Sequence, residues 1–230
     1  MLLQTSPFTL PDRYPEIFGF VRHKLADVPD SRLLSYGCST GEEVFALRDY
    51  FPKSYISGID INAHSIAKAQ TRLGRRPDSR MQFAQAASPR SVPPESLDAI
   101  FCMAVMRQGA LGSNLPDRCE HLIDFATVQA LAAALSRHLN VGGSLAIWHA
   151  NFRFCDMAAS ADFQTALRLP WCEEANHPLY GADNRRISQA TYTDAVFRKK
   201  NAQATTASPR RTRSLANSRT SRLQVSASTS

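Results

Sequence analysis

The sequence lacks the features that mark a membrane or secreted protein. No apolar run approaches the roughly 20 residues that a helix needs to cross a bilayer. The first residues, MLLQTSPFTLPDRYPE, contain neither the basic start nor the long apolar segment of a signal peptide. We therefore expect a cytoplasmic protein with no membrane partner.

Cysteines are also few, and their spacing excludes two common structural devices. They are odd in number and contain no CxxC pair, so the sequence predicts neither a disulfide framework nor a zinc site. We expect reduced thiols, most of them packed as small apolar side chains, and no metal. The five are Cys38, Cys102, Cys119, Cys155 and Cys172.

Positive charge is abundant but confined to one end of the chain. The formal net charge is +7, yet residues 198–230 hold eight basic residues and no acid, which leaves residues 1–197 at −1. The body of the protein is thus nearly neutral, which makes nucleic acid an improbable partner for it.

The last thirty residues differ in composition from the rest. Residues 201–230 are rich in Ser, Thr, Ala, Asn and Arg, with almost no bulky apolar side chains. Such a segment cannot bury enough surface to offset its ordering entropy, so we expect a disordered basic tail. Such a tail can contact RNA or an anionic surface, but it is more often simply a solvated terminus. We divide the chain into an N-terminal helical segment (1–30), one domain (31–200) and the tail (201–230).

Between the two ends, strand and helix patterns alternate, which predicts an α/β fold with a mostly parallel central sheet and helices on both faces. The expected strands are 32–36, 55–60, 81–86, 97–103, 144–149 and 191–198. The expected helices are 14–26, 42–50, 63–73, one that starts after the N-cap Asp124 and ends at residues 140–143, and 162–169. Residues 107–122 have no clear period, and we expect a loop there.

A glycine-containing turn joins the first strand to its helix, and such turns bind polar ligand groups in Rossmann-like folds. The turn reads Gly37-Cys38-Ser39-Thr40-Gly41. A dinucleotide site requires G-x-G-x-x-G so that the pyrophosphate can approach the backbone. Here serine replaces the second glycine and the third is absent, which favours a ligand without phosphates.

Asp60 closes the second expected strand, where a carboxylate can accept hydrogen bonds from both hydroxyls of a ribose. A ribose site beside a glycine loop that does not suit phosphate indicates S-adenosylmethionine (SAM).

The segment SYGCSTGEE (residues 35–43) resembles the first motif of class I SAM-dependent methyltransferases, and GCSTGEE resembles the chemotaxis-receptor (protein-glutamate) methyltransferases in particular. The similarity extends over roughly residues 30–150. It implies a Rossmann-like fold in which residues 37–41 line the methionine part of SAM, Asp60 holds the ribose and Ile61 packs on the adenine. We carry over SAM binding and not the receptor substrate, because Val44-Phe45 stands where those enzymes usually have Pro-Tyr.

The resulting set of expected SAM contacts centres on the loop. Glu42 is placed to meet the SAM ammonium group, while Glu43 completes a capping box with Thr40. Cys102 ends the fourth strand and either borders SAM or belongs to the core. The full set is Tyr36, Gly37, Cys38, Ser39, Thr40, Gly41, Glu42, Asp60, Ile61, Ala87 and Cys102.

No catalytic residue follows from the sequence, and several readings stay open. The Asn/Asp-Pro-Pro-Tyr/Phe motif of amino-group methyltransferases is replaced by Cys102-Met103-Ala104-Val105. His149, after the fifth strand, is a candidate general base if its pKa is near neutral, but a structural role is more common. We expect methyl transfer to a small molecule or to a protein carboxyl or hydroxyl group. The alternative is a non-catalytic SAM-binding adaptor whose tail holds a partner or RNA.

Overall fold

The computed structural model describes residues 12–170, 177–188 and 190–201. Most of the tail expected at 201–230 lies outside these ranges, as does Cys172. Seven strands form one sheet in the order β3-β2-β1-β4-β5-β7-β6, parallel except for β7, which runs antiparallel to both neighbours. The strands are β1 (Arg32–Tyr36), β2 (Tyr55–Asp60), β3 (Met81–Gln85), β4 (Leu97–Met103), β5 (Leu139–Trp148), β6 (Phe163–Arg168) and β7 (Asp194–Lys199).

Five α-helices and two short 3-10 helices join the strands of the described part. None of these helices is long and apolar enough to cross a membrane. They are α1 (Pro15–Lys24), α2 (Glu42–Tyr50), α3 (Ala63–Arg75), α4 (Ala110–Asn114), α5 (Phe125–His138), η1 (Phe154–Asp156) and η2 (Ala158–Asp162).

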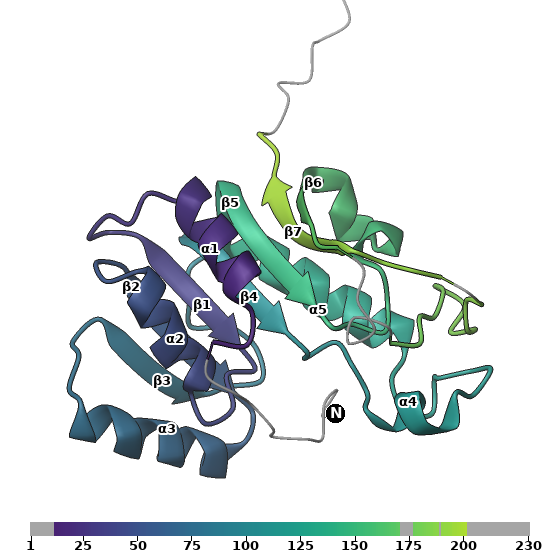
Figure 1. The fold of residues 1–230 in the computed structure, drawn as a ribbon, viewed down its shortest axis with the longest axis horizontal. Helices are drawn as coiled ribbons and strands as arrows, with labels where there is room; N and C mark the ends of the chain where they lie inside the picture. Colours follow the sequence, from purple (N-terminus) through teal and green to yellow (C-terminus); the bar gives the residue numbers. More distant parts are fainter. Residues whose placement is uncertain (1–11, 171–176, 189, 202–230) are drawn as a thin grey trace, which may run out of the picture.

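Helices cover both faces of the sheet, as expected (Figure 1). Helices α1, α2 and α3 contribute buried side chains to one apolar cluster with β1, β2 and β4. Helix α5 contributes Val128, Ala132 and Leu135 to a second cluster, on the opposite face. The near-continuous apolar run Leu97–Met103 lies in the middle strand β4, which is buried on both faces.

The second face is not covered over its whole width. On β2 and β3 it carries Tyr55, Gln82 and Ala84, all exposed, and Gln82 donates a hydrogen bond to Ser57 Oγ at 2.8 Å. These strands therefore alternate polar and apolar residues, a pattern typical of a sheet that faces water on one side.

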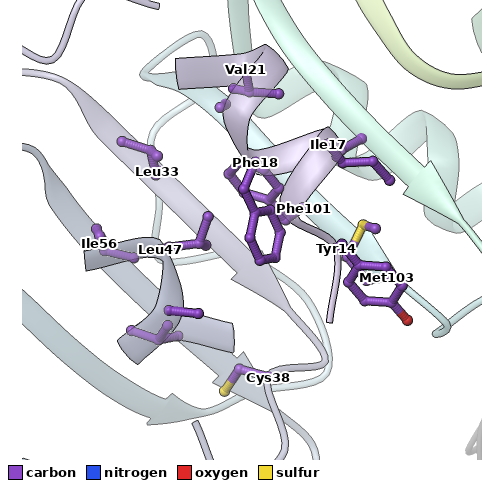
Figure 2. Packing of buried hydrophobic residues seen from close by; sticks show 14 of the residues in the cluster. Tyr14, Ile17, Phe18, Val21, Leu33, Cys38, Leu47, Ile56, Phe101 and Met103 are labelled. Carbon is purple, nitrogen blue, oxygen red and sulfur yellow. The ribbon is translucent and has the colours of Figure 1, made fainter. Parts of the chain in front are cut away.

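Helix α1 belongs to the core of the domain. Ile17, Phe18 and Val21 recur at helical spacing and are fully or almost fully buried. Phe18 contacts Phe101 of β4 edge to face, with ring centroids 5.4 Å apart. Figure 2 shows this packing, with Tyr14 beside Met103 at the end of β4. The helix thereby places the residues that precede it beside the ends of the central strands.

The helix expected over residues 162–169 is wrong, because Phe163–Arg168 is strand β6. Phe163 and Leu167 share a helical spacing, but FQTALR also alternates, and Phe163 and Leu167 are less exposed than their neighbours. Pairing with β7 satisfies the backbone groups of this segment. At a length of six residues, the tertiary partner decided between the two periods.

Three further boundaries differ from the expectation. Helix α5 ends at His138, and residues 140–143, expected to terminate it, already belong to β5 (Leu139–Trp148). The expected loop 107–122 contains the short helix α4. The last strand begins at Asp194 rather than at residue 191. The predicted N-cap is confirmed, since the Asp124 carboxylate accepts a hydrogen bond from the Thr127 amide at 3.0 Å.

The strand order also fixes where a ligand can bind. From β1 the chain proceeds to β2 and β3 on one side, and then returns to β4 on the other side of β1. In open α/β sheets the crevice outside the carboxyl ends of the strands at such a reversal is the usual ligand site. The loop after β1 and the residues after β4 and β5 meet there.

Candidate active site

The loop after β1 is held by its own backbone hydrogen bonds. The amides of Gly37 and Cys38 donate to the Ile59 carbonyl at 2.8 and 3.0 Å, and the Gly41 amide donates to Cys38 O at 2.9 Å. The Ser39 amide donates to Asp60 Oδ2 at 2.8 Å. Because four of its five amides are already paired, the loop is not a phosphate-binding nest, in agreement with the departures from G-x-G-x-x-G.

Three loop residues adopt left-handed backbone conformations, with φ of +76° at Gly37, +49° at Ser39 and +91° at Gly41. A Cβ atom on Gly37 would lie 2.4 Å from Val105 Cγ2, so only glycine fits under that side chain. Ser39 takes the conformation that a second glycine would take, and its hydrogen bond to Asp60 helps to offset the cost. The loop thus keeps the glycine-type geometry although the sequence lacks that glycine.

Asp60 ties the ends of two elements together. Its Oδ2 accepts from the Ser39 amide and its Oδ1 accepts from the Asn62 amide, both at 2.8 Å. Asn62 in turn caps α3, accepting from the amides of His64 and Ser65. Each carboxylate oxygen keeps a second lone pair, so Asp60 can still accept two hydroxyl hydrogens.

The capping box expected at Thr40–Glu43 is wrong. The N-cap of α2 is Gly41, and no side chain caps it. Thr40 Oγ1 instead donates to Glu42 Oε2 at 2.6 Å, and Arg72 of α3 lies 3.7 Å from Glu42 Oε1. The Glu42 carboxylate, expected to meet an ammonium group, is therefore engaged by two side chains of the protein itself.

Glu43 points inward, towards β1. The fully buried Ser35 hydroxyl donates to Glu43 Oε1 at 2.8 Å. Burial raises the pKa of Glu43 to about 7, although the Ser35 hydrogen bond and the positive charge of Arg13 both act in the opposite direction. A carboxyl group with that pKa is present in both protonation states near neutral pH.

Other expected contact residues divide between the open edge and the core. Ile61 is 40% exposed and free to pack against a ligand. Tyr36 ends β1, and its hydroxyl donates to the carbonyl of the exposed Ala87 at 2.7 Å. Cys38 and Cys102 are buried, and burial raises the pKa of both thiols, so each stays protonated. For Cys102 the structure favours the core.

His149 follows β5 directly and has a left-handed φ of +54°. Its imidazole packs between two other rings. The His149 and His177 centroids are 4.8 Å apart, at nearly right angles, and the Tyr14 centroid is 5.5 Å from that of His149. Tyr14 Oη is 3.4 Å from His149 Nδ1.

The surroundings of the two imidazoles keep both neutral. Burial lowers the pKa of His149 to about 3, and His177, Arg13 and Arg107 lower it further. Burial lowers the pKa of His177 to about 4, again with Arg107 and Arg13 acting in the same direction. The near-neutral pKa on which the general-base hypothesis for His149 rests is therefore wrong for this environment, and the imidazole is a weak base.

Sequence reasoning missed four residues of this cluster: Arg13, Tyr14, Arg107 and His177. The single available signal was position, because Arg107 comes four residues after the end of β4, where ligand sites form. Arg13, Tyr14 and His177 lie far in sequence from the Gly37–Gly41 loop. The packing of α1 and the contact of His177 with His149 bring them to this edge of the sheet.

A cleft that is partly open to solvent borders the histidine pair. Its lining combines apolar, aromatic and polar groups, from Ile147, Trp148, His149, Ala150, His177, Leu179, Ala190, Thr191, Tyr192 and Asp194. Within the described ranges, no three His, Cys, Asp or Glu side chains are grouped so that they could hold a metal ion.

The donors and acceptors of this edge fit SAM. Asp60 retains acceptor capacity for ribose hydroxyls, and the exposed Ile61 offers an apolar surface to a base. The paired loop amides suit a ligand that brings no phosphate to them.

Comparison with known families gives one match. Residues 34–145, which are 112 of the 230 residues, match a family model described as a methyltransferase domain. Among curated proteins, none matches the chain.

Several solved structures are similar to the chain in fold. Phosphoethanolamine N-methyltransferase 2 of Haemonchus contortus, in complex with SAM, is 20% identical with a TM-score of 0.45, over 62% of this chain and 29% of that one. The YcgJ protein of Bacillus subtilis is 18% identical with a TM-score of 0.43, over 58% and 50%. Geranyl diphosphate C-methyltransferase of Streptomyces coelicolor is 17% identical with a TM-score of 0.42, over 58% and 43%. The chain thus spans half or less of the length of each.

Proposed function

We propose that this chain, whose residues 34–145 match a methyltransferase-domain model, is a class I SAM-dependent methyltransferase that transfers the methyl group of SAM to a small acceptor molecule. The observation that carries the proposal is the pairing of the Gly37–Gly41 loop with Asp60 at the strand-order reversal. The predicted SAM-contact residues and the predicted domain limits, 1–30, 31–200 and the basic tail 201–230, are part of this proposal.

In this proposal Asp60 accepts hydrogen bonds from the two ribose hydroxyls while its bonds to the loop and to Asn62 hold it in place. The loop backbone lines the methionine part, and Ile61 packs on the adenine. Tyr36 and Ala87 border the same site through their mutual hydrogen bond. Glu42 contributes indirectly, by fixing Thr40.

When bound, SAM supplies a methyl group that its sulfonium activates. The nucleophile of the acceptor bonds to the methyl carbon while the carbon–sulfur bond breaks, and the electron pair of that bond stays on sulfur, so that S-adenosylhomocysteine (SAH) leaves. Any proton on the nucleophile passes to water or to a nearby base. The protein's own part is positioning. Loop backbone, Val105 and Tyr14 present fixed surfaces, and orientation alone can supply much of the rate.

The acceptor is proposed to be small because the cleft beside His149 is lined by apolar and aromatic side chains with a few polar groups, a lining typical of small-molecule sites. The similarity of GCSTGEE to chemotaxis-receptor methyltransferases supports the SAM site in this proposal and not a receptor substrate. The segment after β4 is Ala104-Val105-Met106, which offers no amide or carboxylate to polarise a nucleobase amine.

Calorimetric titration of the full chain with SAH tests the proposal. We expect saturable binding that weakens about 10- to 100-fold in Asp60→Asn, because hydrogen bonds to a charged acceptor contribute about 1.5–3 kcal/mol. The matched control is Asp98→Asn. Asp98 lies in β4 and also holds two donors, the Arg32 amide and Asn140 Nδ2, but it is the second residue of that strand, far from the carboxyl ends.

A second measurement tests transfer itself. The protein is incubated with methyl-labelled SAM and fractionated cell extract, and we expect label in the small-molecule fraction. Absence of SAM and SAH binding to the wild type, or equal losses in Asp60→Asn and Asp98→Asn, would overturn the assignment.

A further inference from the structure

The group of side chains beside the loop has an unusual charge balance. It consists of Arg13 and Tyr14 before α1, Arg107 after β4, His149 after β5, and His177. The Arg13 guanidinium carbon lies 5.3 Å from the centre of the Tyr14 ring. Tyr14 packs on His149, which packs on His177. The contacts therefore run without interruption from the N-terminal segment to the end of β5.

Neither arginine has a carboxylate partner within the described ranges of the chain, where ion pairs do form around eight other basic groups. Both guanidinium groups are partly buried. Burial lowers the pKa of Arg107, and the nearby charge of Arg13 lowers it further. Two like charges held together and partly withdrawn from water are costly without an anion to offset them.

Glu43, an acid whose charge acts on Arg13 and Tyr14, offsets the positive charges of the two arginines only in part. Glu43 interacts with Arg13 and with Tyr14, but its carboxyl has a pKa of about 7 and is bonded to Ser35. Near neutral pH it therefore carries only part of a negative charge. The two histidines are neutral and add donors and acceptors instead of charge.

One nitrogen in this group has an unmet hydrogen-bonding capacity. His177 Nε2 is buried and has no hydrogen-bond partner in the described part of the structure. A buried polar atom without a partner is uncommon in a folded protein and indicates a missing ligand or water. His177 lines the cleft as well as the cluster, so such a ligand would span both.

We infer that the acceptor carries an oxyanion, a carboxylate or a phosphate, that is held by Arg13 and Arg107 beside His149 and His177. This inference rests on the proposed function, because it names the class of molecule that accepts the methyl group. Guanidinium groups bind both anions through paired charge-assisted hydrogen bonds. The arginines thus act as binding residues, and Tyr14 positions His149.

Anion binding would also change the chemistry of His149. Arg13 and Arg107 help to keep its pKa low, so an anion that screens them raises that pKa and makes the imidazole a better proton acceptor. A hydroxyl of the bound acceptor could then pass its proton to His149 as the oxygen takes the methyl group. The groups that face His149 in this account are Tyr14, His177, Arg13 and Arg107.

Calorimetry on the full chain, with and without saturating SAH, tests the inference with two probes, inorganic phosphate and acetate, at constant ionic strength. We expect one-to-one binding of at least one probe, with a millimolar dissociation constant, that weakens about tenfold or more in the Arg13→Gln/Arg107→Gln double variant. Phosphate binding alone indicates a phosphorylated acceptor, and acetate binding indicates a carboxylic acid. The control is Arg75→Gln, an exposed arginine in the last turn of α3.

NMR of the His149 imidazole provides the second readout, in which saturating probe shifts its pKa upward in the wild type and not in the double variant. SAH binding by each variant shows that the variant is folded. SAH binding also separates the two proposals, because a wild type that binds a probe but not SAH overturns the methyltransferase assignment and not the oxyanion site. If neither probe binds saturably, or if binding is equal in the double variant and in Arg75→Gln, the oxyanion site is overturned.

Discussion

Glu43 shows how a single residue can have an environment that its sequence neighbours do not indicate. In the sequence it follows Thr40 at the spacing of a capping box, which predicts a solvent-facing bond to a backbone amide. In the fold Gly41 caps α2, and Glu43 turns towards the buried Ser35 of β1. The same helix position therefore has a different electrostatic consequence, which is a carboxyl group whose pKa is about 7.

Replacing Glu43 with Gln should change the pH dependence of stability. The folded-state pKa lies above the unfolded value of 4.5, so the wild type loses stability as pH rises from about 4.5 through 7. We expect the free energy of unfolding of the wild type to fall by about 1–3 kcal/mol relative to Glu43→Gln between pH 5 and pH 8. Urea unfolding at both pH values measures this difference.

The control for that measurement is Glu16→Gln, which neutralises an exposed acid of α1. It should leave the pH dependence of the wild type almost unchanged. Parallel pH profiles for the wild type and Glu43→Gln would mean that the Glu43 carboxyl ionises as it does in water.

At the level of elements, one buried asparagine connects the loops that build the site. The Asn151 side chain accepts a hydrogen bond from the Gln108 amide at 2.7 Å and donates to the Pro178 carbonyl at 2.9 Å. Its backbone bonds to Met106 and Tyr180. Asn151 is 1% exposed, so these bonds are shielded from water. It thereby fixes the neighbours of both Arg107 and His177.

Asn151→Ala should therefore destabilise the protein by about 2–4 kcal/mol, because it leaves the buried Gln108 amide and the partly buried Pro178 carbonyl without their partner. Urea unfolding measures the loss, and hydrogen exchange of the amides near 107 and 178 should quicken. The control, Asn114→Ala, removes an exposed asparagine at the end of α4 and should change stability by less than about 0.5 kcal/mol. Equal effects of the two substitutions would mean that Asn151 does not hold these loops together.

For the whole molecule, charge and fold are separable. The sequence assigns five arginines and no acid to residues 201–230, so removing them lowers the formal charge from +7 to +2. The described strands and helices end before this segment, since β7 ends at Lys199. The basic character of the chain therefore comes mainly from residues 201–230 and only to a small extent from the residues that precede them.

Deleting residues 202–230 should leave the urea midpoint and the dissociation constant for SAH within error of the full chain, because the sequence of that segment has almost no bulky apolar side chains to add to a core. Cation-exchange retention should fall with the lost charge. A weaker SAH affinity in the shortened chain would show that the tail takes part in the site. Loss of a partner with unchanged SAH affinity and no methyl transfer by either form would instead support the adaptor alternative.

The sequence by itself determined the features that depend on short-range order. Apolar periodicity placed the first four strands and α2 at or within a residue of their observed limits, and the glycine loop with Asp60 located one half of the site. These features are local, because each depends on residues adjacent along the chain or on one strand–turn–helix unit. The resemblance to methyltransferases that the sequence shows also depends on a local segment, SYGCSTGEE at residues 35–43.

Only the tertiary structure decided the rest. The choice of strand over helix for Phe163–Arg168 depended on pairing with β7. The inward turn of Glu43 depended on Ser35, and the cluster of Arg13, Arg107, His149 and His177 depended on which distant segments meet at the strand ends. Burial and neighbouring charge set the pKa values there, and both are properties of packing that no sequence motif encodes.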